Sequence, residues 1–291
     1  MLLQQFINGI TIGSTYALVA IGFTMIFGVL ELTNFSNSSL YMFGAYMTWL
    51  LYGVGMNFFV AFALSVALTG LLGFSIDRFA LRLLRKRHAP KLSGLITTLG
   101  MSMVIDNAIM VFCGTDSKSF ENHLDFGKVY IGNAIISWTQ IIILIVGFSL
   151  MIALSILVYR TKIGKAMTAI AQNQDAAKLM GIDTNKVIAL TFVISGVLAC
   201  IAGTMVAMYY RSIETTMGSL IGTKIFAAAI LGGVGILPGA MVGGILLGIV
   251  ETMVSAYIST GYRDAISFTI LIVVLLFMPN GMFGKKAINK V

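Results

Sequence analysis

Long apolar runs separated by short polar loops dominate this chain. Nine runs are candidate helices: residues 7–30, 40–54, 58–77, 92–113, 138–158, 187–210, 221–237, 238–256 and 265–281. Most approach the roughly 20 residues that an α-helix needs to cross a bilayer. Polar residues at 34–39 delay the second run, and a glycine-rich passage at 232–239 separates the seventh from the eighth. The pattern predicts an all-α integral membrane protein, a polytopic helical bundle of about eight to ten passes, some of them discontinuous.

Composition supports a membrane environment. Of the 291 residues, 58% are hydrophobic and 10% are charged, and the mean hydropathy is +0.96. Soluble domains carry about 25% charged residues, so this chain has too few charges to cover a water-facing surface. The two cysteines, Cys113 and Cys200, lie in apolar runs and predict neither a disulfide framework nor a metal site. The start has no basic region before its first apolar run, which we expect to be retained as a span.

Basic residues predict the orientation. The net charge is +8, and 14 of the 19 Lys and Arg lie in loop 78–91, loop 159–186 and the tail from Lys285. The positive-inside rule places these segments in the cytoplasm. With nine full spans, the N-terminus and the loops near 114–137, 211–224 and 257–264 then face outward. Topology explains the basic excess, so nucleic acid is not needed as a partner. Loop 114–137 is either an external docking loop or an ordinary solvated connection.

The cytoplasmic loop 160–186 contains a helix-favouring segment at 164–181. Small and apolar side chains recur there at helical spacing and predict one continuous face: Ala166, Ala169, Ile170, Asn173, Ala176, Ala177 and Met180. Gly181 is placed to end this helix, and Asp183 or Thr184 to cap the next span. The sequence has no G-x-x-x-x-G-K-[ST] motif, so uphill transport would draw its energy from a partner. We expect this face to dock onto a partner ATPase; an amphipathic helix lying on the membrane surface is the alternative.

Several motifs resemble one family. Asp175-Ala176-Ala177 followed by Gly181 resembles the E-A-A-x-x-x-G coupling loop of bacterial ABC importer permeases. Other stretches are similar to the high-affinity branched-chain amino acid permeases of that class: 161–166, 169–173, 180–182, 222–235 with 238–239 and 243–244, 276–284, and 13–17 with 34–35 and 44–46. The similarity covers nearly the whole chain, which would then be a single transmembrane permease domain over 1–291.

The resemblance implies a heteromeric importer in a bacterial or archaeal plasma membrane. Its parts would be two similar permease subunits, two ATPases that bind ATP and Mg, and an extracytoplasmic solute-binding protein. This chain would bind no cofactor and would not be an enzyme. The residues expected to couple it to the ATPases are Gly164, Ala166, Ala169, Ile170, Asn173, Asp175, Ala176, Ala177 and Gly181.

The sequence leaves the substrate open. After Asn34-Phe35 the family usually has Ala, then His or Gln, Gly and an acidic residue, whereas this chain has Ser36-Asn37-Ser38-Ser39. Branched-chain amino acids are the first expectation, and urea, other amides and other amino acids are the alternatives, because permeases of the same family serve them. An ion-coupled secondary transporter is a further alternative.

Interrupted segments in corresponding halves of a transporter often mark the solute pathway. On this basis we expect seven residues to line it: Asn34, Ser36, Asn37, Thr97, Thr98, Gly232 and Gly233. Tight packing is the alternative, and it is the preferred interpretation for the glycines after 239, such as Gly243, Gly244 and Gly248.

Two charged residues, Asp106 and Glu251, lie well inside apolar runs, whereas Lys224 is near the end of one and could reach the interface. Buried charges of this kind either relay protons or are satisfied structural polar groups or subunit contacts, and the second interpretation is preferred. His88 and His123 have no neighbours that suggest metal binding or catalysis. The sequence also contains no H-E-x-x-H or nucleophile motif.

Overall fold

The computed structural model describes residues 2–30, 32–87, 89–122, 127–131, 134–278 and 281–284. Within them, each of the nine predicted runs overlaps one helix. These helices are α1 (Leu2–Leu30), α2 (Ser36–Gly53), α3 (Phe58–Ser75), α5 (Lys91–Cys113), α6 (Trp138–Arg160), α9 (Thr184–Tyr210), α10 (Met217–Gly232), α11 (Leu237–Tyr257) and α12 (Arg263–Phe277). His88, His123, Pro279, Asn280 and the lysines at 285, 286 and 290 lie outside the described residues.

Six of the described helices are long and apolar enough to cross a membrane. They are α1, the continuous helix Phe58–Lys86, α5, α6, α9 and α11. Helix α10 is apolar but shorter. The Phe58–Lys86 helix includes α3, a π-helical turn η1 (Ile76–Leu81) and α4 (Arg82–Lys86). The chain is therefore an all-α polytopic membrane protein, as the apolar runs predict.

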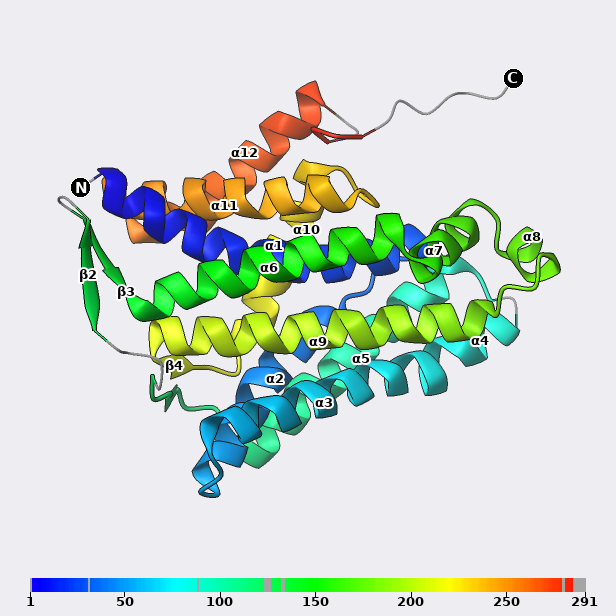
Figure 1. Cartoon of the computed structure of the whole chain (residues 1–291), viewed down its shortest axis with the longest axis horizontal. Coiled ribbons are helices and arrows are strands. Elements are labelled where there is room, and N and C mark those ends of the chain that lie inside the picture. Colours follow the sequence, from blue (N-terminus) through cyan, green and yellow to red (C-terminus); the bar gives the residue numbers. More distant parts are fainter. Residues whose placement is uncertain are drawn as a thin grey trace.

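The loops separate to the two ends of the bundle (Figure 1). At one end, hairpin β2 (Lys128–Ile131) and β3 (Ala134–Ser137) lies beside the N-terminus, where the Gln4 side-chain amide donates to the Ile135 carbonyl at 2.9 Å. Strands β1 (Lys118–Ser119) and β4 (Ser212–Ile213) pair with each other. At the other end lie α4, α7 (Lys162–Gln172) and α8 (Gln174–Leu179). The basic loops thus share the end opposite the N-terminus, which the positive-inside rule assigns to the cytoplasm.

Helix α1 runs through the centre of the bundle, with 89% of its most apolar window buried. It packs closely against α11 (Figure 1). A Cβ added at Gly248 would lie 2.3 Å from the Cα of Gly13, and one added at Gly244 would lie 2.5 Å from the Cα of Ala17. Only a residue without a side chain permits this approach, which gains dispersion contacts in a bilayer. The packing role predicted for Gly244 and Gly248 is confirmed by these contacts.

We expect Gly248→Val to lower the thermal stability of the detergent-solubilised protein, because the added side chain must push α11 away from α1. Overpacking of this kind costs about 1–3 kcal/mol. Gly100→Val on α5 is the matched control, since a Cβ there meets nothing within 4 Å. Melting followed by fluorescence-detected size exclusion measures both variants. Equal melting temperatures for the two would contradict the close α1–α11 contact.

Candidate functional site

Helix α2 begins inside the bundle, after a short non-helical segment at residues 32–35, which we call the α2 break. Buried polar groups stabilise this segment. The Asn34 Oδ1 accepts hydrogen bonds from the Ser36 N–H at 3.2 Å and from the Ser36 hydroxyl at 2.6 Å. From α5, the Thr98 hydroxyl accepts the Phe35 N–H at 3.4 Å and lies 3.3 Å from the Thr33 carbonyl. All but Thr33 and Phe35 are buried. Irregular backbone at membrane depth is tolerated when it is buried in protein or lines a cavity. Here the segment is packed inside the protein, and these hydrogen bonds satisfy its polar groups.

Asn37 ties the start of α2 to two other helices. Its side-chain amide donates to the Val19 carbonyl of α1 at 3.3 Å, and its Oδ1 accepts from the Ser195 hydroxyl of α9 at 2.7 Å. Among the described residues, the buried Asn34 Nδ2 has no hydrogen-bond partner. This amide therefore keeps a hydrogen-bond donor that its neighbours at the start of α2 do not use.

Asp106 faces the same region from α5. It lies against Ser39 and Ser102, whose hydroxyls are 2.7 Å apart. A Cβ added at Gly218 of α10 would lie 3.7 Å from the Asp106 Oδ1. The polar row Asn34, Thr98, Ser39 and Asp106 therefore follows the first half of α2 where α5 and α10 pack against it. Thr97 is half-buried and donates instead to the Ser93 carbonyl of its own helix, at 2.8 Å.

The structure places Gly232 and Gly233 in a different set of contacts. They form the turn between α10 and α11, where Gly233 has a φ of 107°. A Cβ added at Gly232 would lie 2.0 Å from the Gly239 carbonyl oxygen, and the Phe283 N–H donates to the Gly232 carbonyl at 3.2 Å. The first is a close packing contact and the second is a backbone hydrogen bond. The two interrupted segments are therefore held by different neighbours.

Glu251 lies in a charged cluster between α10, α11 and α12. Its carboxylate is fully buried and pairs with Lys224 of α10 and Arg263 of α12. Lys224 also contacts Asp264 at 3.0 Å. Lys224 is only 11% exposed, so the expectation that it reaches the interface is wrong; the buried carboxylate across the helix contact holds it inside. The partners of Glu251 were not apparent from the sequence because they come from different helices. A lysine within an apolar run was nevertheless a signal that a buried carboxylate could pair with it.

The cytoplasmic segment 160–186 folds as two helices, so the prediction of one continuous helix is wrong. Asn173 adopts an extended conformation (φ −161°, ψ 111°), and its side chain accepts the N–H groups of Asp175 and Ala176, both at 3.0 Å. Asn competes with helical hydrogen bonding in this way, which ends α7 and starts α8. The small residues before and after Asn173 therefore lie on separate helices.

Part of the predicted docking face is turned into the protein itself. Gly164, Ile170 and Ala177 are buried, and a Cβ added at Gly164 would lie 2.0 Å from the Val158 carbonyl oxygen. The remaining members of that set are half-buried or exposed: Ala166, Ala169, Asn173, Asp175, Ala176 and Gly181. The expectation of one small-residue face that is free for a partner is therefore corrected.

The small residues are followed by two larger apolar side chains that are highly exposed. Leu179 is 90% exposed and Met180 is 83% exposed, at the end of α8. Gly181 follows with a φ of 83°, as expected for the residue that ends a helix. Asp183 caps α9 by accepting the Lys186 N–H, and this bond holds the pKa of the Asp183 carboxyl below its usual value. The tip formed by Leu179 and Met180 is therefore held in a defined position.

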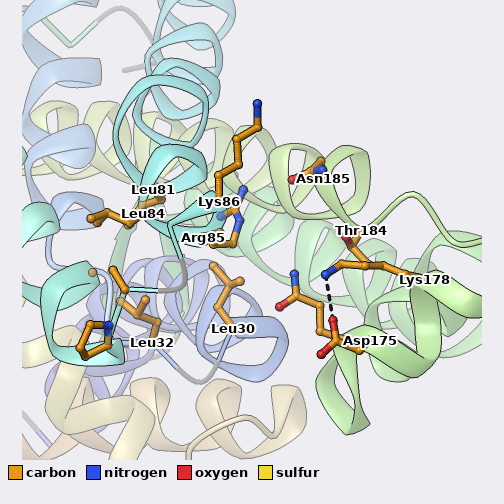
Figure 2. Close-up of a pocket in the computed structure, with 14 residues that line it drawn as sticks. Leu30, Leu32, Leu81, Leu84, Arg85, Lys86, Asp175, Lys178, Thr184 and Asn185 are labelled. Carbon is orange, nitrogen blue, oxygen red and sulfur yellow. Dashed lines mark hydrogen bonds and ion pairs between the residues drawn. The ribbon is translucent and has the colours of Figure 1, made fainter.

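A polar cavity of about 470 Å³ lies beside this tip, between α4, α8 and the start of α9. Figure 2 shows Asp175 and Lys178, which are ion-paired at 2.9 Å, on one side of it and Arg85 and Lys86 on the other. Arg85 is anchored by the buried Asp77 of the π-helical turn, at 2.7 Å. This end of the protein thus presents basic groups and an apolar tip together.

Among the described residues, no group of three or more His, Cys, Asp or Glu is placed to hold a metal ion.

Comparison with known proteins agrees with these features. Residues 5–275 match the family described as branched-chain amino acid transport system / permease component. The chain is 39% identical to the high-affinity branched-chain amino acid transport system permease protein BraD of Pseudomonas aeruginosa, over 99% of this chain and 98% of that protein. It is 38% identical to the corresponding permease protein LivH of Escherichia coli, over 99% and 97%.

An archaeal relative extends the comparison. The chain is 29% identical to the probable branched-chain amino acid transport permease protein LivH of Methanocaldococcus jannaschii, over 92% of this chain and 88% of that protein. The family match spans α1 to α12 and includes the broken start of α2, the α7–α8 segment and the charged cluster. The chain is a multi-pass membrane protein that belongs to the family of branched-chain amino acid transport system permease components.

Proposed function

We propose that this chain is a permease subunit of an ATP-driven importer that carries branched-chain amino acids across the plasma membrane. The apolar tip Leu179–Met180 is the observation that carries the proposal. Large apolar side chains that are 90% and 83% exposed at the end assigned to the cytoplasm favour contact with a partner protein. The sequence has no phosphate-binding loop of its own, so the partner is an ATPase. Two such ATPases hold ATP and Mg, and this chain holds no cofactor.

The complete importer contains two permease subunits and an extracytoplasmic binding protein that delivers the solute. The substrate class rests on the names of the two relatives that are 38–39% identical over 99% of this chain. Solute passes the broken start of α2, where Asn34, Thr98 and Asp106 offer hydrogen bonds to a zwitterion. Movement of the partner ATPases, transmitted through α7 and α8, opens this route alternately to the two sides.

An ion-coupled mechanism is less well supported. A proton relay through Glu251 would require a carboxylate that is free to change its charge, and Glu251 is paired with both Lys224 and Arg263. Asp106 lies against the hydroxyls of Ser39 and Ser102 and is not part of the charged cluster, so it is the residue to test.

We expect Asp106→Asn to reduce solute uptake by no more than about threefold, because the amide keeps the hydrogen-bonding role beside Ser39 and Ser102. Uptake into cells that express the complete importer measures the effect, with the amount of membrane-inserted protein as the reference. Complete loss of uptake at normal assembly would support proton coupling instead.

The substrate is tested by uptake into proteoliposomes that contain the permeases and ATPases, with the binding protein outside and ATP inside. We expect saturable uptake of labelled leucine, isoleucine and valine that each of the three inhibits. Urea and acetamide, which represent the amide-transporting alternative, should neither enter nor compete. Uptake of urea or acetamide in place of leucine would contradict the proposed substrate.

A further inference from the structure

The outer cavity is a second feature of the bundle, at the end that carries the N-terminus. Its volume is about 400 Å³, and it lies between α1, α2, α9, α10 and α12. Ligand pockets in proteins have volumes of roughly 300–1,000 Å³, so the space suits a small molecule. Neither Asn34 nor any other residue predicted from the sequence to line the pathway borders it.

Two cations of the charged cluster, Lys224 and Arg263, border the outer cavity. Buried and half-exposed carboxylates hold both in place: Glu251 contacts each of them, and Asp264 contacts Lys224. The Arg263 guanidinium also donates to the hydroxyls of Tyr16 and Tyr210, at 3.4 and 3.3 Å. These tyrosines line the same cavity. Pre-positioned cations of this kind suit a carboxylate, because little ordering is required when it binds.

A carboxylate that can bind an ammonium group also borders the cavity. Glu214 borders the cavity and is exposed. Glu251 is fully buried, is paired with both cations and does not line the cavity, so Glu214 is the carboxylate that a bound ammonium group can contact. A ligand that carries both a carboxylate and an ammonium group matches this arrangement better than a simple anion would.

Part of the remaining wall is apolar. Four side chains supply it, from α9 and α10: Val206, Met217, Leu220 and Ile221. The cavity also adjoins the polar row of α2. Gly218 and Gly222, which lie between the wall residues of α10, contact Ser38: a Cβ added at Gly222 would lie 3.0 Å from the Ser38 Cβ. A solute that leaves the outer cavity along α2 therefore meets the hydroxyls beside Asp106 next.

We propose that the outer cavity is a binding site for an amino-acid zwitterion with an aliphatic side chain. Lys224 and Arg263 bind its carboxylate, Glu214 attracts its ammonium group, and the four apolar residues contact its side chain. The site receives the solute before it enters the α2 break. This inference rests on the proposed function for its place in transport, but the site is defined by its own chemistry.

Photo-affinity labelling tests the site directly. The complete importer in nanodiscs is irradiated with photo-leucine, a diazirine analogue of leucine, and adducts are mapped by mass spectrometry. We expect adducts on α10 between Met217 and Ile221 and at Val206, which excess leucine prevents. Leucinamide lacks the carboxylate and 4-methylpentanoate lacks the ammonium group, so each should protect at least tenfold less well than leucine. Equal protection by either compound would overturn the zwitterion site.

A pair of tryptophan variants controls for non-specific labelling. Leu220→Trp fills the cavity without touching the charged cluster, and it should reduce labelling at least tenfold. Leu71→Trp on α3 adds the same side chain at a position that is exposed and outside the cavity, and it should leave labelling unchanged. Leucine uptake with no adduct in the cavity would overturn this inference alone. Cavity labelling in an importer that does not take up leucine would support the site and contradict the proposed substrate.

Discussion

We expect Glu251→Leu to destabilise the folded protein strongly, because the fully buried carboxylate is the shared partner of Lys224 and Arg263. Its removal leaves two cations beside each other inside the bundle, with Asp264 in contact with Lys224 only at its half-exposed rim. Breaking a buried ion pair by removing one partner costs about 3–5 kcal/mol. The measurement is the melting temperature and the monodisperse yield of the detergent-solubilised protein.

Asp264→Asn is the control within the same cluster. The Asp264 side chain is 50% exposed, so water screens its charge and an exposed pair contributes only about 0–1 kcal/mol. We expect a small change in melting temperature. If Glu251→Leu were as stable as the Asp264 variant, the charged cluster would not hold α10, α11 and α12 together.

The second large effect is expected at the cytoplasmic tip. Leu179→Glu places a carboxylate on the surface that we propose to bind the partner ATPase, where it must be buried without a partner of opposite charge. A central interface residue costs about 1–2 kcal/mol when it is truncated, and burial of an unpaired charge adds to that cost. We expect at least a tenfold loss of ATP-driven uptake and of ATPase recovered with the tagged permease.

Leu2→Glu provides the matched control at the opposite end of the bundle. Leu2 is 67% exposed on α1, and the same substitution there should change neither uptake nor ATPase recovery. Membrane insertion of both variants should equal that of the unchanged protein, since each side chain lies outside the core. Normal uptake by the Leu179 variant would remove the α8 tip from the coupling interface.

The positions of the helices could be predicted because apolar runs report directly on burial in lipid. The residue at which α2 begins could not be predicted in this way. Hydropathy excluded the polar residues 36–39, yet α2 begins at Ser36. These side chains can be buried because three of them form hydrogen bonds with Asn34, Ser195 and Ser102. Contacts between segments that are far apart in sequence determine this helix boundary.

Two features of the candidate sites could not be predicted for a similar reason. Helical spacing on both sides of Asn173 suggested one continuous helix, because the pattern does not report that this side chain caps α8 instead. The charged cluster joins Lys224, Glu251 and Arg263 from three different helices. Glu251 alone could be singled out from the sequence as costly to bury, but its partners became apparent only from the packing of α10 and α12 against α11.

The α2 break also lies between the proposed zwitterion site and the proposed ATPase-binding tip. The outer cavity lies above it, bordered by Tyr41 of α2, and the cavity beside the α8 tip lies toward the other end of the bundle, bordered by Leu30 and Leu32. The row of Asn34, Thr98 and Asp106 lies between these two cavities. If solute moves along the first half of α2, it leaves the bundle beside α7 and α8, the helices that we propose to transmit movement of the ATPases.

Transport in proteoliposomes shows whether this chain receives its energy from partner ATPases, as we propose. Vesicles that contain the two permeases and two ATPases, with binding protein outside, are supplied either with internal ATP or with an imposed proton or sodium gradient. We expect leucine to accumulate when ATP and binding protein are both supplied, and we expect that neither gradient replaces ATP. Accumulation driven by an ion gradient in vesicles that contain this chain without ATPases would contradict this proposal.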